Sequence, residues 1–471
     1  MIVRPGSLTL AVAFVAAVSS CAALAGETYA FPAGFLWGTA TAAHQVEGNN
    51  SNSDWWDWEQ VPGHIKHNDH SGLADDHYHL FAADLALARD LGNNAYRFSV
   101  EWARLEPEEG RFDEREAAHY RAVLEACKAN GLTPIVTLFH FTLPRWLAAK
   151  GGWLSPSTPA LFARYAAFAA ARFGDLADLW CTLNEPVVYL GAGYLKGVFP
   201  PGILDLRQAL IVMENLARGH ALAAKAIKEH DRKSLAKNGP PAVVTIAHHM
   251  RVFDPARSWH PIDIVATRVV DYIFNKAFLD AITRGRLYFN IPGFPRVDVV
   301  IPGGKHSLDI LGINYYSRDL IKFNPRSPLL SDQLHPRDAQ LTDLGWEIYP
   351  EGLYRLLVGT WKDYGLPILV TENGIADGSD SKRSEFLRQH LQAMARAMKD
   401  GVPVLGYLHW SLLDNFEWAE GFWPRFGLYS VDYATQQRRP TKAAEVYRQI
   451  IGAGKIDLGK SEDLGPEDEA E

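Results

Sequence analysis

Cysteine is scarce in this chain of 471 residues, which contains only three. So few cysteines exclude a disulfide framework and a cysteine-rich zinc site. Basic residues are not in excess either, since 47 Lys and Arg stand against 55 Asp and Glu, for a formal charge of −8. Without a basic surface, nucleic acid is not an expected partner. Beyond the N-terminus no run approaches about 18 consecutive apolar residues, so no membrane span is expected.

The first 25 residues have the pattern of a secretory signal. Arg4 precedes the apolar run Leu8–Val18, which is too short for a membrane span. Two processing signals overlap after it. Ala23-Leu24-Ala25 fits an A-x-A cleavage site before Gly26, whereas Val18-Ser19-Ser20-Cys21 resembles a bacterial lipoprotein box, in which Cys21 would carry a lipid anchor. Both alternatives predict a secreted or periplasmic protein.

Short apolar runs rich in β-forming residues recur along the rest of the chain. Their continuous apolar character is typical of parallel strands that are buried on both faces. Helical patterns long enough for crossover connections lie between them. The predicted strands are Phe35–Ala43, Asn94–Trp102, Thr133–Phe141, Leu179–Asn184, Ala242–His248, Asp309–Tyr316, Pro367–Thr371 and Val404–Leu412. The predicted helices include Glu114–Asn130, Pro159–Leu179, Leu206–His230, Ile264–Arg286 and Arg383–Asp400.

Eight strand–helix units without a second composition class predict a single (β/α)8 TIM-barrel domain with long βα loops, over residues 26–454. An open doubly wound sheet is the alternative, and it is disfavoured because no G-x-G-x-x-G follows the first strand. Segments 287–307 and 324–345, which are rich in Pro and Gly, are interpreted as loop insertions. Residues 455–471 carry a net charge of −5 and are expected to form a disordered acidic tail.

Carboxylates stand at two of the predicted strand ends. The fourth strand runs into Asn184 and Glu185, and the seventh runs into Glu372. A buried carboxylate without partners is costly, so a pair at the mouth of a barrel indicates either structural ion pairs or catalysis. The other strand ends supply Gln45, Arg97, His140, Tyr316, Trp410, Glu417 and Trp418. Two carboxylates, amides, one Arg and several Trp in one mouth suggest cleavage of a glycosidic bond.

Six long motifs extend this interpretation. They are FPAGFLWGTATAAHQVEG at 31–48, YRFSVEWAR at 96–104, FGDLADLWCTLNEP at 173–186, LGINYYS at 311–317, LVTENG at 369–374 and HWSLLDNFEWAEGF at 409–422. Through them the sequence resembles family 1 glycoside hydrolases, the β-glucosidase family, over roughly residues 31–452. The resemblance implies a (β/α)8 fold and a retaining mechanism without metal or cofactor.

The resemblance also implies roles for individual residues. Glu185 matches the acid/base of the family, and Glu372 matches its nucleophile. Residues that match glycone contacts are Gln45, His140, Asn184, Trp410, Glu417 and Trp418. Arg97, Asn314 and Tyr316 match residues that hold the nucleophile and its surroundings.

The chemistry places requirements on the two carboxyls. Retention needs them only about 5–5.5 Å apart, so that Glu372 can attack the anomeric carbon. Arg97 and Tyr316 are expected to keep Glu372 ionised. Glu185 has to start protonated, so we expect its pKa to be raised by burial and by the nearby carboxylate. Asn184 is expected to bond the 2-hydroxyl.

Two departures from the family pattern stand out. Many relatives have H-W-D-L-P where this chain has His140-Phe141-Thr142-Leu143-Pro144, a change beside a glycone contact. Glu101 stands where relatives often have Ser. The acid/base Glu185 and the pair Glu417-Trp418 are retained, unlike in thioglucosidases and phospho-glycosidases of the family.

One histidine-rich stretch has the composition of a metal site. Because similar strings occur in metal-independent relatives, no metal is predicted there. The stretch contains His64, His67, His70, His77 and His79, with Asp69, Asp75 and Asp76.

The sequence therefore predicts a retaining β-glycosidase, with short β-glucosides as small-molecule substrates. A β-galactosidase or β-fucosidase is the alternative within the family, since only contacts to the 4- and 6-hydroxyls separate them. A catalytically dead sugar-binding protein on the same fold is the alternative from another class. The retention of both Glu185 and Glu372 argues against it.

Overall fold

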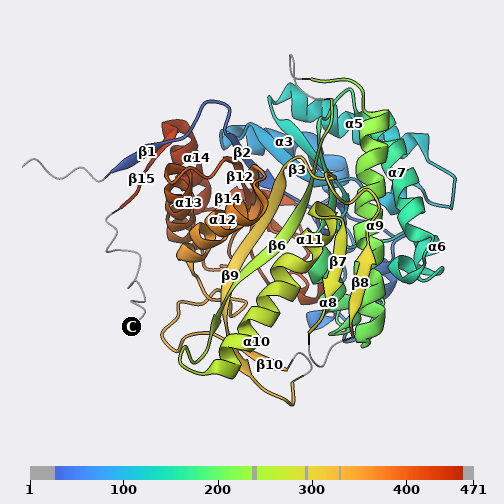
Figure 1. The fold of residues 1–471 in the computed structure, drawn as a ribbon. Helices are drawn as coiled ribbons and strands as arrows, with labels where there is room; N and C mark the ends of the chain where they lie inside the picture. The colour runs from blue at the N-terminus through green and yellow to red at the C-terminus, as the bar shows by residue number, and fades with distance from the viewer. Residues whose placement is uncertain (1–26, 236–240, 292–294, 328–329, 460–471) are drawn as a thin grey trace, which may run out of the picture.

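Strands and helices alternate along the chain, and the strands close into a barrel (Figure 1). The computed structural model describes residues 27–235, 241–291, 295–327 and 330–459. Its eight parallel barrel strands are hydrogen-bonded in the order β2-β3-β4-β5-β6-β9-β11-β12, and β12 pairs with β2 to close the ring. They are β2 (Leu36–Ala40), β3 (Ala95–Ser99), β4 (Thr133–Phe139), β5 (Leu179–Asn184), β6 (Val243–Pro255), β9 (Leu311–Phe323), β11 (Ile368–Asn373) and β12 (Val404–Trp410). The predicted (β/α)8 barrel is confirmed.

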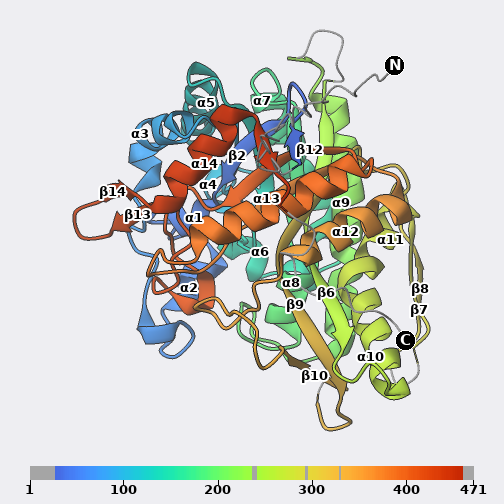
Figure 2. The same ribbon diagram turned by 90° about the vertical axis from the view of Figure 1, so that its left-hand side faces the viewer.

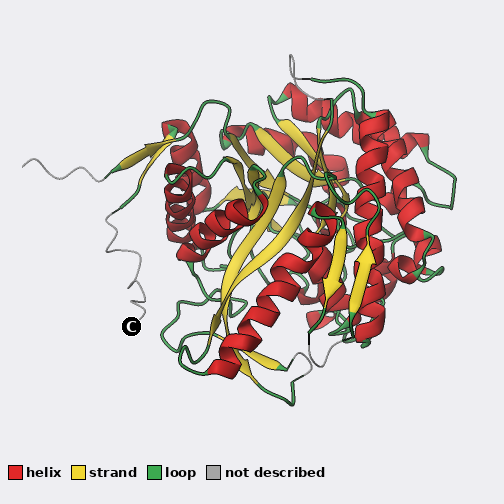
Figure 3. Cartoon of the chain, in the orientation of Figure 1, coloured by secondary structure: helices red, strands yellow, loops and turns green. Residues whose placement is uncertain are grey.

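Helices surround the strands on the outside (Figure 3). Helix α9 shows how the sequence sets one of them: Asp205 caps it by accepting hydrogen bonds from the backbone N–H of Arg207 and Gln208, at 2.7 and 3.2 Å. Its alanine-rich face packs on α7, and Figure 2 shows α12, α13 and α14 side by side. The long outer helices are α3 (His77–Asp90), α5 (Glu114–Ala129), α7 (Thr158–Phe173), α9 (Leu206–His230), α12 (Pro350–Tyr364), α13 (Arg383–Lys399) and α14 (Lys442–Ala453).

Two strands are longer than predicted. β6 and β9 continue past the barrel as a paired ribbon, with Asp254 opposite Leu320 and Pro255 opposite Ile321. In Figure 1 this ribbon reaches down to α10 (Pro261–Asp271) and β10 (Ser331–Leu334). Outside the barrel one face of β6 and β9 is in contact with solvent, so these segments carry polar residues as well. The continuous apolar run that predicts each strand therefore ends before the strand does.

The predicted helix Ile264–Arg286 is interrupted. α10 is followed by a wider π-type turn over Tyr272–Lys276 and then by α11 (Ala277–Thr283). The segment 287–307, predicted as a loop insertion, contains part of an antiparallel pair formed by β7 (Arg286–Phe289) and β8 (Val297–Val300). The segment 324–345 contains β10, which pairs with β9.

The two ends of the described chain lie side by side. β1 (Thr28–Ala30) pairs antiparallel with β15 (Lys455–Asp457), so the predicted start of the acidic tail at residue 455 falls inside a strand. Non-local pairing of this kind leaves no signal in the local composition. Residues 1–26, which contain the predicted leader and Cys21, and residues 460–471 of the predicted tail lie outside the described residues.

Shorter elements complete the fold. Within the described ranges no helix combines the length and the hydrophobicity that a membrane span requires. The short helices are α1 (Ala43–Val46), α2 (Asp54–Glu59), α4 (Trp102–Leu105), α6 (Arg145–Ala148) and α8 (Pro186–Tyr194), and β13 (Tyr429–Asp432) pairs with β14 (Gln437–Pro440).

Candidate active site

The two predicted catalytic carboxylates lie at the C-terminal ends of β5 and β11. β5 ends at Asn184, and Glu185 takes a left-handed backbone conformation with φ of 43° before α8 begins. In β11 a register shift brings Glu372 opposite Asn314 of β9. Both carboxylates are buried, with only 7% of Glu185 and 4% of Glu372 exposed. Charged groups at this depth require hydrogen-bonding partners.

Glu372 is held by two strong donors. Arg97 Nη1 donates to Oε1 at 2.5 Å, and the Tyr316 hydroxyl donates to Oε2 at 2.6 Å. Burial raises the pKa of Glu372 to about 7, with Glu185 adding to the rise and with Arg97 and Tyr316 opposing it. The two donors thus favour the ionised carboxylate that a nucleophile needs, against the cost of desolvation.

Glu185 has partners that the prediction did not include. Asn314 Nδ2 donates to Oε1 at 2.8 Å, and His249 Nδ1 lies 3.3 Å from the same oxygen. Burial alone would raise the pKa of Glu185, but His249, Asn314 and Arg97 together hold it below its ordinary value. The expected upward shift is therefore wrong for the free protein, because a donor on β6 stabilises the charged form.

The two carboxyls titrate as a pair. Each raises the cost of ionising the other, so a proton on Glu185 lowers the pKa of Glu372 and the reverse also holds. The unfavourable interaction disappears when one of the two carboxyls holds a proton. In the free protein the directions of the two pKa shifts favour that proton on Glu372. An acid and a nucleophile require it on Glu185, with Glu372 held as a carboxylate by Arg97 and Tyr316.

A chain of amides and a guanidinium connects the two carboxyls. Arg97 Nη2 donates to Asn184 Oδ1 at 2.7 Å, and Asn314 Nδ2 donates to the same oxygen at 3.3 Å. Since that oxygen accepts both bonds, the Asn184 amide nitrogen faces His140 Nε2, at 3.0 Å. Asn314 thus bonds to Glu185 and not to Glu372, whereas Arg97 and Tyr316 bond to Glu372.

Unpartnered polar atoms mark the adjoining part of the mouth. His140 Nε2 accepts from Asn184, so its Nδ1 carries the hydrogen, and burial together with Arg97 holds the pKa of His140 well below its usual range. Among the described residues, buried His140 Nδ1 and Gln45 Oε1 have no hydrogen-bond partner. A neutral donor and a neutral acceptor left open in this way suit a ligand rich in hydroxyl groups.

Aromatic rings enclose this part of the site. His140 stacks on Trp410 and Trp418, with ring centroids 5.9 and 5.8 Å apart. Gln45 Nε2 donates to Glu417 at 3.4 Å. Burial raises the pKa of Glu417 to about 8, and the charges of Glu372 and Glu185 add to this rise. Predicted residues that follow β2 and β4 are thus in contact with predicted residues at and after the end of β12.

His249 is the residue that the prediction missed. It belongs to the doublet His248-His249, which lies in the middle of β6. Its place near the rim of the barrel was the available signal, but a pair of buried histidines without a motif does not indicate which of them faces the site.

The histidine-rich stretch after α2 forms separate contacts. His77 Nδ1 lies 2.8 Å from Asp84 Oδ2, and exposed His79 Nδ1 lies 2.6 Å from Asp76 Oδ1. In the part of the chain that the structure describes, no group of three His, Cys, Asp or Glu side chains could hold a metal ion.

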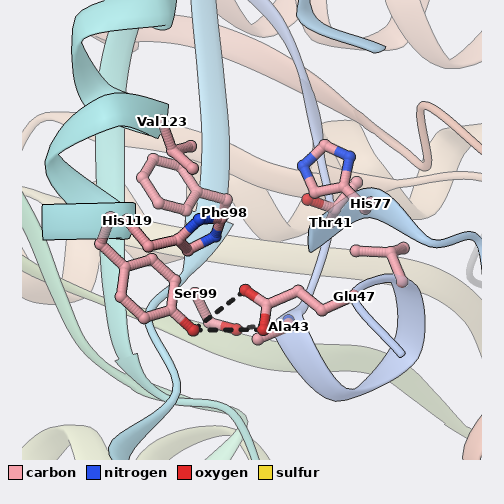
Figure 4. Close-up of a pocket in the computed structure, with 10 residues that line it drawn as sticks. Thr41, Ala43, Glu47, His77, Phe98, Ser99, His119 and Val123 are labelled. Atoms are coloured by element: carbon pink, nitrogen blue, oxygen red, sulfur yellow. Dashed lines mark hydrogen bonds between the residues drawn. The ribbon is translucent and has the colours of Figure 1, made fainter. Parts of the chain in front are cut away.

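Beside His77 the protein encloses a small cavity of about 10 Å³ (Figure 4). Glu47, His119 and Tyr120 also line it, and the Tyr120 hydroxyl donates to both Glu47 oxygens, at 3.0 and 3.2 Å. This volume suits about one water molecule and is far too small for a sugar. The mouth with Glu185 and Glu372 therefore remains the candidate active site.

Comparison with known proteins agrees with this geometry. The family model described as glycosyl hydrolase family 1 matches residues 27–455. β-Glucosidase A of Thermotoga maritima is 37% identical over 446 residues, covering 89% of this chain and 97% of that protein. The β-galactosidase of Pyrococcus woesei is 33% identical over 510 residues, covering 92% and 99%. A solved structure of the family 1 β-glucosidase from Thermotoga maritima superposes with a TM-score of 0.85 at 34% identity, covering 91% of this chain and 99% of that one.

Proposed function

The chain belongs to glycosyl hydrolase family 1, whose members are retaining β-glycosidases, and on that premise we propose that it releases terminal, non-reducing β-D-glucosyl residues from short β-glucosides such as cellobiose and aryl glucosides. One observation supports this proposal above the others. Buried Glu372 is held by Arg97 and Tyr316, and it is linked through Asn184 and Asn314 to an equally buried Glu185.

In the first step the Glu372 carboxylate attacks the anomeric carbon of the bound sugar. The bond to the glycosidic oxygen breaks as Glu185 gives that oxygen its proton, which leaves a covalent glycosyl-enzyme and releases the aglycone. Esterified Glu372 no longer carries charge, so the ionised Glu185 is free of its repulsion.

In the second step Glu185 acts as a base. It takes a proton from a water molecule that attacks the anomeric carbon, the ester bond to Glu372 breaks, and the sugar leaves with its β-configuration retained. The Asn184 amide is the proposed partner of the 2-hydroxyl, a contact that strengthens in the transition state.

Gln45, His140, Trp410, Glu417 and Trp418 are the proposed glycone contacts. The open acceptor Gln45 Oε1 and the open donor His140 Nδ1 supply neutral hydrogen bonds, and Glu417 accepts bonds from the 4- and 6-hydroxyls. A β-galactosidase or β-fucosidase would differ only in these contacts, and the similarity to a relative named β-galactosidase supports that alternative.

A panel of aryl β-glycosides that differ only in the sugar tests the assignment. We expect the highest kcat/KM on the β-glucoside, lower values on the β-galactoside and β-fucoside, and no turnover of the α-glucoside. The product anomer, followed by NMR at early times, should be β. A preference for the galactoside would replace the glucosidase assignment, and binding without turnover of any glycoside would indicate a dead sugar-binding protein.

A further inference from the structure

The side chain of His249 reaches from β6 to the acid/base. Its Nδ1 lies 3.3 Å from Glu185 Oε1, and only 8% of the side chain is exposed. His248, the residue before it, points to the opposite face of the strand, because side chains alternate along a strand. Its Nε2 lies 3.0 Å from the Asn275 carbonyl oxygen. Of the two histidines, only His249 therefore faces the catalytic pair.

The tautomer of His249 is set by the residue two positions further along β6. Arg251 Nε donates to His249 Nε2 at 3.4 Å, and Arg251 Nη1 donates to Asp319 Oδ2 at 2.8 Å. Because a guanidinium can only donate, His249 Nε2 must accept, and the hydrogen of the neutral ring then sits on Nδ1. The ring consequently donates to Glu185.

Both donors to the acid/base converge on one oxygen. Asn314 Nδ2 donates to Glu185 Oε1 at 2.8 Å, and His249 Nδ1 lies 3.3 Å from the same oxygen. An oxygen that accepts two N–H groups is a poor place for an acidic proton, since the O–H hydrogen would compete with the donors for the same lone pairs. Oε2 is the oxygen left for the proton that the reaction transfers.

We propose that His249 is a positioning residue for the acid/base: by donating to Oε1 it reserves that oxygen as an acceptor, so that Glu185 presents its acidic proton on Oε2 toward the leaving group. Arg251 and Asp319 hold the ring in the required tautomer. The inference rests on the proposed glycosidase function.

Other charged and titratable groups also surround Glu185, and their influence has to stay constant in a test. They are Arg97 on β3, His140 directly after β4, His248 and Arg251 on β6, Tyr316 on β9, Glu372 on β11 and Glu417 after β12. None of them is altered by a neutral substitution at residue 249, so a change in the pH profile of such a variant reports on the hydrogen bond.

The test compares His249→Leu, which removes the donor, with His249→Asn, whose amide nitrogen reaches about as far as Nδ1. Each variant is assayed on cellobiose and on dinitrophenyl β-glucoside across pH. In His249→Leu, kcat/KM on cellobiose should fall about tenfold more than on the activated substrate, because only the poor leaving group needs the proton. Loss of the donor to the Glu185 carboxylate should also move the alkaline limb of the kcat/KM pH profile to higher pH, by roughly half a pH unit or more. His249→Asn should stay within about threefold of the wild type.

Equal losses on both substrates with an unmoved alkaline limb would overturn the proposal and leave His249 a structural residue. If His249→Leu does not fold, as judged by near-UV circular dichroism, Arg251→Lys gives the same test, because it keeps the positive charge beside Asp319 but removes the Nε donor to His249 Nε2, and it should move the limb in the same direction. An unmoved limb in that variant would also overturn the proposal. A wild type inactive on both substrates would instead refute the proposed function.

Discussion

The Thr142 hydroxyl donates to the carboxylate of Glu101, with 2.9 and 3.0 Å to its two oxygens. Both residues belong to the departures from the family pattern, in which relatives often have Asp at the position of Thr142 and Ser at that of Glu101. The carboxylate and the hydroxyl have therefore exchanged places across one buried contact. Burial raises the pKa of Glu101, which also accepts from the backbone N–H of Ala103 at the start of α4.

The exchange predicts strong coupling between the two positions. Thr142→Asp alone would bring two carboxylates into contact in the interior, and we expect the free energy of unfolding to fall by about 3 kcal/mol. The double variant Glu101→Ser/Thr142→Asp restores one carboxylate and one hydroxyl and should recover at least about half of the loss. Chemical denaturation of both single variants and the double variant measures this. Additive losses would contradict the exchange.

A second prediction concerns the charge of the glycone pocket. Glu417, Glu185 and Glu372 place three carboxyls there, and buried Arg97 already pairs with Glu372. A 6-phosphate would bring further negative charge beside these carboxyls, of which Glu185 has a lowered pKa, and Arg97 is not free to act as its counter-ion. We expect kcat/KM for an aryl β-glucoside to exceed that for its 6-phosphate by at least about tenfold. Comparable rates on the two substrates would show that a cation reaches the 6-position.

The third prediction uses the bond between Tyr316 and Glu372. This donor stabilises the ionised carboxylate, so its removal in Tyr316→Phe raises the pKa of Glu372 further. The nucleophile has to be ionised, and its protonation produces the acid limb of kcat/KM. The acid limb should therefore move to higher pH, and activity should fall more at pH about 5 than at pH about 7. An unchanged acid limb, measured on an aryl glucoside, would exclude this role for Tyr316.

The residues show why the sequence predicts some features of this molecule and not others. Barrel strands such as β5 are buried on both faces, so their apolar runs define them, and motifs at their ends identify Glu185 and Glu372. Past residue 248 strand β6 leaves the barrel, and polar Arg251 and Asp254 interrupt the pattern. The sequence could therefore not indicate the strand's length.

Contacts between distant residues escape prediction for a different reason. Thr142 and Glu101 are 41 positions apart, and His249 lies on β6 while Glu185 directly follows the neighbouring strand β5. Whether two such side chains come into contact depends on which residues lie at the rim of the barrel and on the register of the strands. The amino-acid composition carries no information about either. The direction of the Glu185 pKa shift was mispredicted for the same reason, since it depends on His249.

The fourth prediction concerns the location of the protein. A charged start, an apolar run and two processing signals at Ala25 and Cys21 lead us to propose that the protein is exported, either cleaved before Gly26 or lipidated at Cys21. Intact-mass analysis of protein from the cell envelope and the medium should find the leader removed. The mass of a lipid on the N-terminal cysteine would identify the second route. Export would be refuted if the sole species found were the unprocessed protein that begins at Met1.

The fifth prediction separates the two catalytic carboxylates by their tasks. In the proposed mechanism Glu372 forms the covalent bond, so Glu372→Gly should abolish turnover of every substrate. Glu185 protonates the departing oxygen, which cellobiose needs and an acidic dinitrophenol hardly does. In Glu185→Ala, kcat/KM on cellobiose should fall roughly 10²–10⁴-fold, while kcat/KM on dinitrophenyl glucoside, which reports the first step, should fall far less.

The same variant also tests the second step. Without Glu185 no base activates water, so the glycosyl-enzyme should accumulate and kcat on dinitrophenyl glucoside should drop. Azide needs no base, and it fits the space that the truncated side chain leaves. Added azide should therefore restore kcat and yield a β-glycosyl azide, because two displacements at the anomeric carbon retain its configuration. An α-configured azide would mean a single displacement, and equal losses of kcat/KM on both substrates would mean that the two carboxylates have exchanged roles.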